Sequence, residues 1–288
     1  MEMSYISFPY LGLKFEIDRV AFTIGNKDIY WYGIIIAIGF LLAVITAVYL
    51  SKRVGLNKDT IIDVVLFAAP VSIIGARAYY VAFRWEYYGL HPEEIVQIWN
   101  GGIAIYGAIL CAIAVTVIYC RIKKENLGLV CDVGSIGLAI GQCIGRWGNF
   151  VNQEAFGVNT TLPWAMTGDE IKRELANLLA DGVAVDPSLP VHPTFLYESL
   201  WNLVVIAILI SCLKKRKFDG QVFLEYIILY GLGRFWIEGL RTDSLVAGNF
   251  RVSQIVSVLF VVIGIITISA KIVKTKKINS ESNEDISQ

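Results

Sequence analysis

Long apolar segments separated by short polar connections dominate the chain. Seven of them approach the length that crosses a bilayer as a helix, about 20 residues, and they are 29–50, 61–83, 101–120, 129–147, 195–213, 222–240 and 252–270. A longer polar stretch, residues 148–194, separates the fourth segment from the fifth. The pattern predicts an all-α polytopic membrane protein with seven transmembrane helices and a small insert between spans four and five.

The two ends of the chain differ from this pattern. Residues 1–28 have neither a basic start followed by an apolar core nor a small-residue cleavage site, so we expect no cleaved signal peptide. Loose alternation over residues 15–32, with a turn at Gly25-Asn26, predicts a short hairpin. The polar residues after Lys277 are expected to be unstructured. We therefore divide the chain into an arm (1–28), a membrane-embedded catalytic domain (29–272, with the insert 148–194) and a tail (273–288).

Composition supports a membrane protein. Hydrophobic residues make up 56% of the chain and the mean hydropathy is +0.59, whereas soluble domains are about 45–50% apolar. The formal net charge is zero, and nothing in the charge balance points to nucleic acid. The five cysteines lie in or at the ends of apolar segments without metal-ligand spacing, so we interpret them as small core residues and expect no metal or cofactor.

Basic residues give an orientation. They follow alternate apolar segments, the first, third, fifth and seventh, as Lys52, Arg53, Lys58; Arg121, Lys123, Lys124; Lys214, Lys215, Arg216, Lys217; and Lys271, Lys274, Lys276, Lys277. Connections rich in Lys and Arg stay in the cytoplasm. The N-terminus and the insert are therefore predicted outside, and the C-terminus is predicted inside.

The insert contains one clear helix signal. Thr167 followed by Glu170 predicts a capping box, and Gly182 predicts the end of the helix. The apolar stripe of this helix is Ile171, Leu175, Leu178 and Leu179. The stripe could pack on a core within the insert or lie on the outer membrane surface.

Charged residues within the apolar segments converge on one level. With the orientation above, Arg77 lies near the outer end of the second segment, Arg146 ends the fourth, and Glu198 begins the fifth. Arg234 and Glu238 lie in the outer half of the sixth segment and, four residues apart, can pair on one helix face. Charges inside a membrane are costly, and their gathering in one leaflet indicates a functional cavity there.

The stretch 145–154 holds the densest set of polar groups. Arg146 is followed by Asn149, Asn152 and Glu154, and the two amides share a face if the helix continues. Ahead of them, glycines repeat every fourth residue, at Gly137, Gly141 and Gly145, which lets another helix approach closely. A lone arginine at a helix end could simply reach the interface, but the neighbouring amides and acid favour a binding site.

Arginine at the level of the lipid headgroups favours an anionic phospholipid as ligand, because its planar fork binds phosphate with two hydrogen bonds. Arginines outnumber acids in this region, with Arg77, Arg146, Arg234 and Arg241 against Glu154, Glu198 and Glu238. His192 is one of two histidines, and a single histidine is more often structural than a ligand. No metalloprotease, serine-hydrolase or phosphate-loop motif is found.

The chain resembles the bacterial prolipoprotein diacylglyceryl transferase family from about residue 8 to residue 270. The strongest match is Gly145-Arg146-Trp147-Gly148-Asn149-Phe150-Val151-Asn152-Gln153-Glu154. Further matches follow in order, at Trp31-Tyr32-Gly33, Gly75-Ala76-Arg77, the glycine-rich stretch 101–107, His192-Pro193 with Tyr197-Glu198, and Gly233-Arg234-Phe235 with Glu238 and Arg241. The family has seven membrane helices with the N-terminus outside, as the basic residues predict here independently.

The resemblance implies an enzyme of the bacterial cytoplasmic membrane with its active site facing the outer leaflet. It would transfer the diacylglyceryl group of phosphatidylglycerol to the lipobox cysteine of a prolipoprotein signal peptide, without a cofactor, and release glycerol phosphate. The implied catalytic residues are Arg146, Arg234, Glu154 and Tyr106, and the implied substrate-binding residues are Arg146, Tyr32, Asn149, Asn152, Gly157, Glu198, Glu238, Arg241, Arg77 and His192. Glu154 could orient an arginine or accept the thiol proton.

Tyr106 departs from the family pattern. Many members carry histidine where this chain has Tyr106, so the resemblance carries no histidine base over to this position. A phenol with a pKa near 10 is neutral at pH 7, which favours a hydrogen-bonding or packing role.

Two other functions fit membrane spans with buried charges, a polytopic transporter or channel and a non-catalytic protein that binds anionic lipid. A transporter site would be expected near the midplane rather than in one leaflet.

Overall fold

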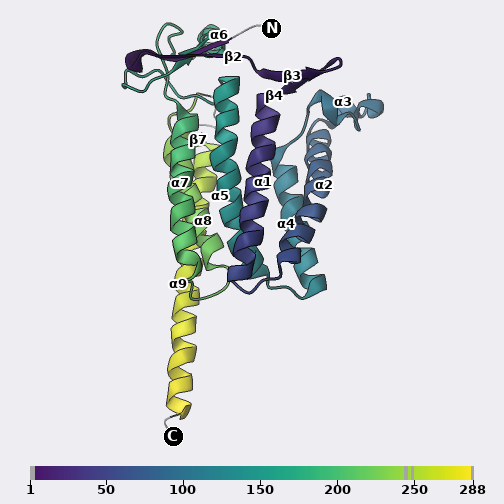
Figure 1. The fold of residues 1–288 in the computed structure, drawn as a ribbon, viewed down its shortest axis with the longest axis vertical. Helices are drawn as coiled ribbons and strands as arrows, with labels where there is room; N and C mark the ends of the chain where they lie inside the picture. The colour runs from purple at the N-terminus through teal and green to yellow at the C-terminus, as the bar shows by residue number, and fades with distance from the viewer. Residues whose placement is uncertain (1–3, 243–245, 248–249, 287–288) are drawn as a thin grey trace. The chain divides into compact units, whose positions relative to one another are not determined.

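The computed structural model describes residues 4–242, 246–247 and 250–286. The chain forms two compact units, one of Met1–Ala43 with Ser135–Gln288 and the other of Val44–Gly134. Nine α-helices are assigned in the described residues: α1 Trp31–Arg53, α2 Lys58–Phe83, α3 Trp85–Tyr88, α4 Ile105–Lys123, α5 Leu127–Asn152, α6 Asp169–Ala180, α7 Thr194–Leu213, α8 Gln221–Glu238 and α9 Val252–Ile286. Figure 1 shows the fold.

By length and composition, six of the described helices can cross a membrane: α1, α2, α4, α5, α7 and the Val252–Lys274 part of α9. They correspond to six of the seven predicted spans. Helix α8 matches the remaining one, but its 18 residues include Glu225, Arg234 and Glu238. The chain is thus a mostly helical, polytopic membrane protein, and two of the three charged residues of α8, Arg234 and Glu238, are candidate site residues.

Short strands accompany the helices, so the predicted all-α class is too narrow. The arm forms β1 Ser4–Phe8, β2 Leu13–Ile17, β3 Val20–Ile24 and β4 Lys27–Tyr30, the insert forms β5 Thr167–Gly168, and β6 Val246–Ala247 and β7 Phe250–Arg251 precede α9. Strands β3 and β4 make the hairpin expected around Gly25-Asn26. Sequence reasoning missed β1 and β2, which pair with β5 in the order β2-β1-β5.

Close helix packing in the first unit depends on glycine. A Cβ atom at Gly137 would lie 3.2 Å from the carbonyl oxygen of Ala43 in α1, and one at Gly145 would lie 3.2 Å from Ile36. The predicted glycine face of α5 therefore does receive a neighbouring helix. Helix α8 packs against both α7 and α9 (Figure 1). A Cβ atom at Gly233 would clash with the Trp201 indole of α7.

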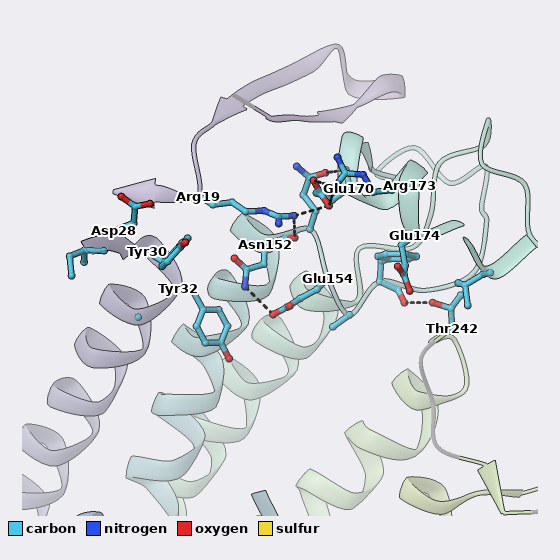
Figure 2. A pocket seen from close by; sticks show the side chains of 16 residues that line it. Arg19, Asp28, Tyr30, Tyr32, Asn152, Glu154, Glu170, Arg173, Glu174 and Thr242 are labelled. Atoms are coloured by element: carbon cyan, nitrogen blue, oxygen red, sulfur yellow. Dashed lines mark hydrogen bonds and ion pairs between the residues drawn. The ribbon is translucent and has the colours of Figure 1, made fainter. Parts of the chain in front are cut away.

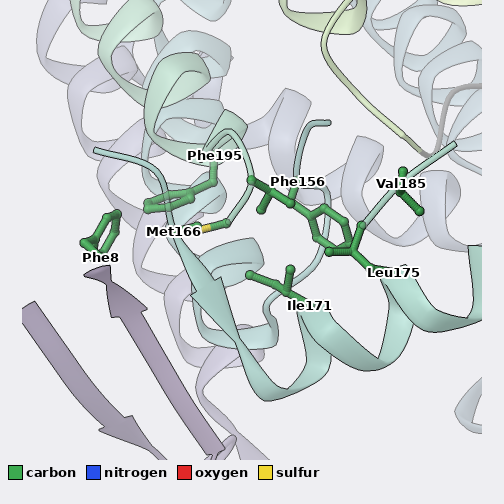
Figure 3. Packing of buried hydrophobic residues seen from close by; sticks show 8 residues of the cluster. Phe8, Phe156, Met166, Ile171, Leu175, Val185 and Phe195 are labelled. Atoms are coloured by element: carbon green, nitrogen blue, oxygen red, sulfur yellow. The ribbon is translucent and has the colours of Figure 1, made fainter. Parts of the chain in front are cut away.

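The core of the insert joins it to the arm. A buried cluster unites one arm residue, Phe8, with residues of the insert and the start of α7 (Figure 3): Phe156, Met166, Ile171, Leu175, Val185, Val191 and Phe195. Ile171 and Leu175 of α6 are fully buried in this cluster. Packing on a core within the insert is therefore confirmed for Ile171, Leu175 and the partly buried Leu178, whereas Leu179 is 50% exposed.

The start of α6 differs from the predicted capping box. Thr167 lies in β5, Gly168 occupies the N-cap position, and the helix begins at Asp169. Gln153, at the end of α5, supplies the cap instead, because its Oε1 accepts a hydrogen bond from the Glu170 N–H at 3.1 Å. A partner 17 residues away replaces the local one, which a short sequence pattern cannot indicate.

In the second unit, α2 and α4 pack closely where Gly75 of α2 faces Gly107 of α4. A Cβ atom at Gly107 would collide with the Gly75 carbonyl, and one at Gly75 would collide with Cys111. The connection between the two helices carries α3 and two 3-10 turns, Pro92–Glu94 and Ile98–Asn100.

The tail prediction was wrong in its described part. Helix α9 continues to Ile286, because no Gly or Pro after Gly264 interrupts it. Ser287 and Gln288 of the predicted tail lie outside the described residues.

Candidate functional site

A buried carboxylate from α7 is the centre of the site. Glu198, 5% exposed, lies within salt-bridge distance of three guanidinium groups from two other segments. Its Oε2 lies 2.6 Å from Nη2 of Arg146 in α5, and its Oε1 lies 3.3 Å from Nη1 of Arg234 in α8 and 3.3 Å from Nη1 of Arg241. One acid thereby gathers arginines that are up to 95 residues apart in sequence.

A second acid completes what we call the arginine–glutamate cluster: Arg146, Glu198, Arg234, Glu238 and Arg241. Arg234 pairs with Glu238 one turn along α8, as the spacing predicts. The cluster contains three formal positive charges and two negative ones. The arginine side chains are more exposed, at 10–23%, than the two glutamates, at 7% and 2%. The glutamates therefore hold the guanidinium groups together, and the arginines are the more accessible members of the cluster, which suits an anionic ligand.

Two amides connect the cluster to a third acid. Asn149 accepts a hydrogen bond from Nη1 of Arg146 at 3.3 Å and donates one to Oε1 of Glu154 at 2.8 Å. Asn152 donates to the same Glu154 oxygen at 3.4 Å. Helix α5 continues through these residues, so both amides do face one acceptor. Glu154 is exposed and makes no ion pair with a described residue, in contrast to Glu198 and Glu238.

An open cavity lies beside Glu154 (Figure 2). Its volume is about 830 Å³, and its wall includes Tyr32, Asn152 and Glu154 together with residues of the arm, of α6 and Thr242. The Tyr32 ring lies over Gly148, where an added Cβ atom would lie 2.8 Å from the ring. We call this space the arm cavity. Tyr32, Asn152 and Glu154 thus lie where the cavity meets the hydrogen bonds that lead to Arg146.

Gly157 holds the insert against the segment that carries Arg241. Its N–H donates to the His192 carbonyl at 3.0 Å, and it forms an isolated antiparallel bridge with Arg241. A Cβ atom at Gly157 would lie 2.8 Å from His192 Cβ and 2.9 Å from the Leu240 carbonyl oxygen. Gly157 therefore affects the cluster through the position of Arg241.

His192 belongs to a separate set of contacts. Its Nδ1 lies 3.1 Å from the Tyr197 hydroxyl, which accepts a hydrogen bond from the Trp164 indole N–H at 2.7 Å. Burial lowers the pKa of His192 below its ordinary value. These contacts give the imidazole a structural partner, and no hydrogen bond or ion pair of its ring to the cluster is found among the described residues.

Arg77 and Tyr106 lie in the second unit. Arg77 is 6% exposed, and its guanidinium donates to four backbone carbonyls in the connection after α2. These are the carbonyls of Glu94, Ile95, Gly101 and Gly102, at 2.6–2.9 Å. This geometry braces that connection. Tyr106 lies in the first turn of α4, is 51% exposed and has its ring centroid 6.4 Å from that of Tyr79.

One residue of the site was missed from the sequence. Arg19, in the arm, donates to the Asn152 carbonyl at 2.8 Å and lies 3.4 Å from Glu170 of α6 (Figure 2). It lies in no apolar segment and belongs to no motif, so only the pairing of the arm with the insert could have indicated it. Within the described residues, no group of His, Cys, Asp and Glu is arranged to hold a metal ion.

Fold and site together define a polytopic membrane protein with a positively charged site beside a polar cavity. Residues 19–270 match the family model described as prolipoprotein diacylglyceryl transferase, and the chain belongs to this family. Curated relatives named phosphatidylglycerol–prolipoprotein diacylglyceryl transferase occur in Finegoldia magna and in Clostridioides difficile. The first is 45% identical over 87% of this chain and 94% of its own length, and the second is 41% identical over 93% and 100%. A relative of the same name from Listeria innocua is 44% identical over 86% of this chain and 88% of its own length.

Proposed function

We propose that this protein transfers the diacylglyceryl group of phosphatidylglycerol to the lipobox cysteine of prolipoproteins. The observation that carries the proposal is the set of three arginines around Glu198, in a chain whose relatives are named for this reaction. A phospholipid phosphate suits a cluster in which arginines outnumber acids, and the side chains of Arg146 and Arg234 are partly exposed, at 23% and 17%.

The reaction needs no nucleophile from the enzyme. The cysteine sulfur attacks the glycerol carbon that bears the phosphate ester, the S–C bond forms, and the C–O bond to phosphate breaks. Glycerol phosphate leaves with the electron pair, and the thiol proton passes to a base and then to water. Arg146 and Arg234 stabilise the charge that develops on the leaving phosphate, and cations near the thiol favour its thiolate.

Glu154 fits the role of the base better than that of an arginine-orienting group. Glu198 and Glu238 already pair with arginines, whereas Glu154 accepts hydrogen bonds from two neutral amides and borders the arm cavity. A carboxylate without a cationic partner is free to accept a proton. Asn149 ties this base to Arg146, so both would keep a fixed position relative to the reacting carbon.

The membrane arrangement forms part of the proposal. Seven helices, with α8 as the sixth span, would place the N-terminus and the insert outside and the C-terminus inside, as the basic connections indicate. The arginine–glutamate cluster would then face the outer leaflet of the bacterial cytoplasmic membrane. Phosphatidylglycerol would come from the bilayer, and the prolipoprotein signal peptide would enter from the same membrane.

Purified protein mixed with phosphatidylglycerol and a synthetic lipobox peptide tests this function. We expect a peptide whose mass increases by one diacylglyceryl group on the cysteine, with no product from a peptide that carries serine there. Lipid binding without peptide modification would favour the lipid-binding scaffold. Movement of a solute across proteoliposomes, without modification, would favour a transporter.

A further inference from the structure

The arm cavity and the arginine–glutamate cluster carry opposite charge. Four acids line the cavity, at Asp28, Glu154, Glu170 and Glu174, against two arginines, Arg19 and Arg173. Both arginines are paired to the same acid, Glu170, at 3.4 Å and 3.1 Å. The remaining three acids make no ion pair with any described residue. An anionic headgroup is therefore attracted to the cluster and repelled from the cavity.

The walls of the cavity suit a polypeptide. Apolar and aromatic side chains of Ile29, Tyr30, Phe156 and Leu178 alternate with the charged ones. The volume of about 830 Å³ lies within the range of about 300–1,000 Å³ typical of ligand pockets. Strand β4 of the arm and helix α6 both line the cavity, and Arg19 of the arm contacts Asn152 and Glu170 (Figure 2). A hydrogen bond from Arg19 to the Asn152 carbonyl and an ion pair between Arg19 and Glu170 hold this frame.

The cavity lies beyond the ends of two apolar helices. Its wall contains Asp28 to Tyr30, which come directly before α1, and Gln153 to Phe156, which come directly after α5. The apolar part of a signal peptide stays in the bilayer, whereas the residues that follow the lipobox cysteine leave it. Glu154 borders both the cavity and the hydrogen bonds to Arg146, so a chain that leaves the reaction site enters the cavity first.

We propose that the arm cavity binds the segment of the prolipoprotein that directly follows the lipobox cysteine, and that its acids favour neutral or cationic residues there. The inference rests on the proposed function and assigns the two substrates to two sites of opposite charge. The positive cluster takes the lipid phosphate and the acidic cavity takes the polypeptide. Asp28 and Glu174 are exposed acids of the cavity wall, outside the hydrogen bonds that connect Glu154 to Arg146.

Two lipobox peptides that differ only after the cysteine test the inference, one with lysines and one with glutamates at the third to fifth positions. For the wild-type protein we expect a KM about three- to tenfold lower for the lysine peptide, as two weakly screened charge pairs would give. Asp28→Lys combined with Glu174→Lys should reverse the order of the peptides and leave the KM for phosphatidylglycerol unchanged. The difference should diminish at high salt.

The double variant Glu16→Lys with Asp181→Lys is the matched control, because both residues are exposed acids of the arm and the insert that do not line the cavity. It should keep the wild-type order of the peptides. Equal KM values for the two peptides with wild-type protein, or the same reversal in the control, would overturn the inference and leave the transferase function intact. Absence of any lipidated peptide from the wild-type protein would contradict the proposed function itself.

Discussion

At the scale of residues, Glu198 shows how a buried acid can assemble a cationic site. Three guanidinium groups lie within 3.3 Å of its carboxylate, and without it their mutual repulsion would oppose the cluster. The sequence predicted that Arg146, Glu198 and Arg234 lie at one level, and it predicted the pair of Arg234 with Glu238. It could not predict that Arg241 shares the same carboxylate, because Arg241 follows the end of α8, where no periodicity gives a direction.

Replacing the cluster arginines with lysine tests the phosphate site. Arg146→Lys and Arg234→Lys keep the charge but lose the planar fork, and we expect kcat to fall about 10²- to 10³-fold, the loss typical of one transition-state donor. Arg216→Lys, at a position that pairs with Asp219 instead, is the control and should keep its activity. Turnover near the wild-type value in both cluster variants, measured with purified, folded protein, would remove these residues from the mechanism.

Conservative substitutions distinguish the catalytic role of Tyr106 from that of Glu154. The Tyr106 hydroxyl has no hydrogen-bond partner among the described residues and its side chain is half exposed, so Tyr106→Phe should retain more than about a tenth of the turnover.

Loss of a general base costs about 10²- to 10⁴-fold in turnover, and we expect a fall in that range for Glu154→Gln at saturating lipid. The reverse result, with folding and lipid binding unchanged, would make the Tyr106 hydroxyl the catalytic group.

At the scale of elements, the helices were predictable and the strands of the arm largely were not. A run of apolar residues determines a membrane-length helix regardless of its partners, and each predicted span overlaps a helix. Strand β2 pairs with β1, and β1 pairs in turn with β5, which lies more than 150 residues beyond β1 in the chain. The cap of α6 from Gln153 depends on the same long-range contacts. The arm cavity arises from these contacts, and so could not be predicted.

Gly157 tests how the insert controls the cluster. Because an added Cβ atom would lie under 3.0 Å from both His192 and Leu240, Gly157→Ala should lower the free energy of unfolding by about 1–3 kcal/mol. It should also lower kcat/KM, because the bridge to Arg241 is displaced. Gly134→Ala, where an added Cβ atom meets nothing within 4 Å, is the control for thermal stability and activity. Unchanged thermal stability and kcat/KM for Gly157→Ala would show that Gly157 is not tightly packed against His192 and Leu240.

At the scale of the whole molecule, composition and the pattern of apolar segments carried most of the prediction. They indicated a polytopic membrane protein, and six membrane-length helices bear this out. The number of spans depends on α8, whose 18 residues include three charged ones and which is not among the six helices that meet the length and composition of a span. Two of these charges, Arg234 and Glu238, belong to the arginine–glutamate cluster, so the site residues of this helix weaken its membrane signal.

Cysteine labelling tests the orientation. In a background with the five native cysteines replaced, we expect Asp181→Cys to react from outside intact cells with a membrane-impermeant maleimide. Arg216→Cys should react only after the membrane is opened, since basic connections stay in the cytoplasm. Labelling of Arg216→Cys alone in intact cells would invert the topology and place the cluster at the cytoplasmic leaflet.

The most direct test of the account is the fate of the lipid phosphorus. Purified protein, phosphatidylglycerol and a lipobox peptide would be followed by ³¹P NMR, which distinguishes the phosphodiester of the lipid from a phosphomonoester. We predict one equivalent of glycerol phosphate for each lipidated peptide, none with a peptide that carries serine in place of cysteine, and a strongly reduced rate with Arg146→Lys. Lipidated peptide without release of a phosphomonoester would contradict the claim that the arginine–glutamate cluster stabilises a leaving phosphate.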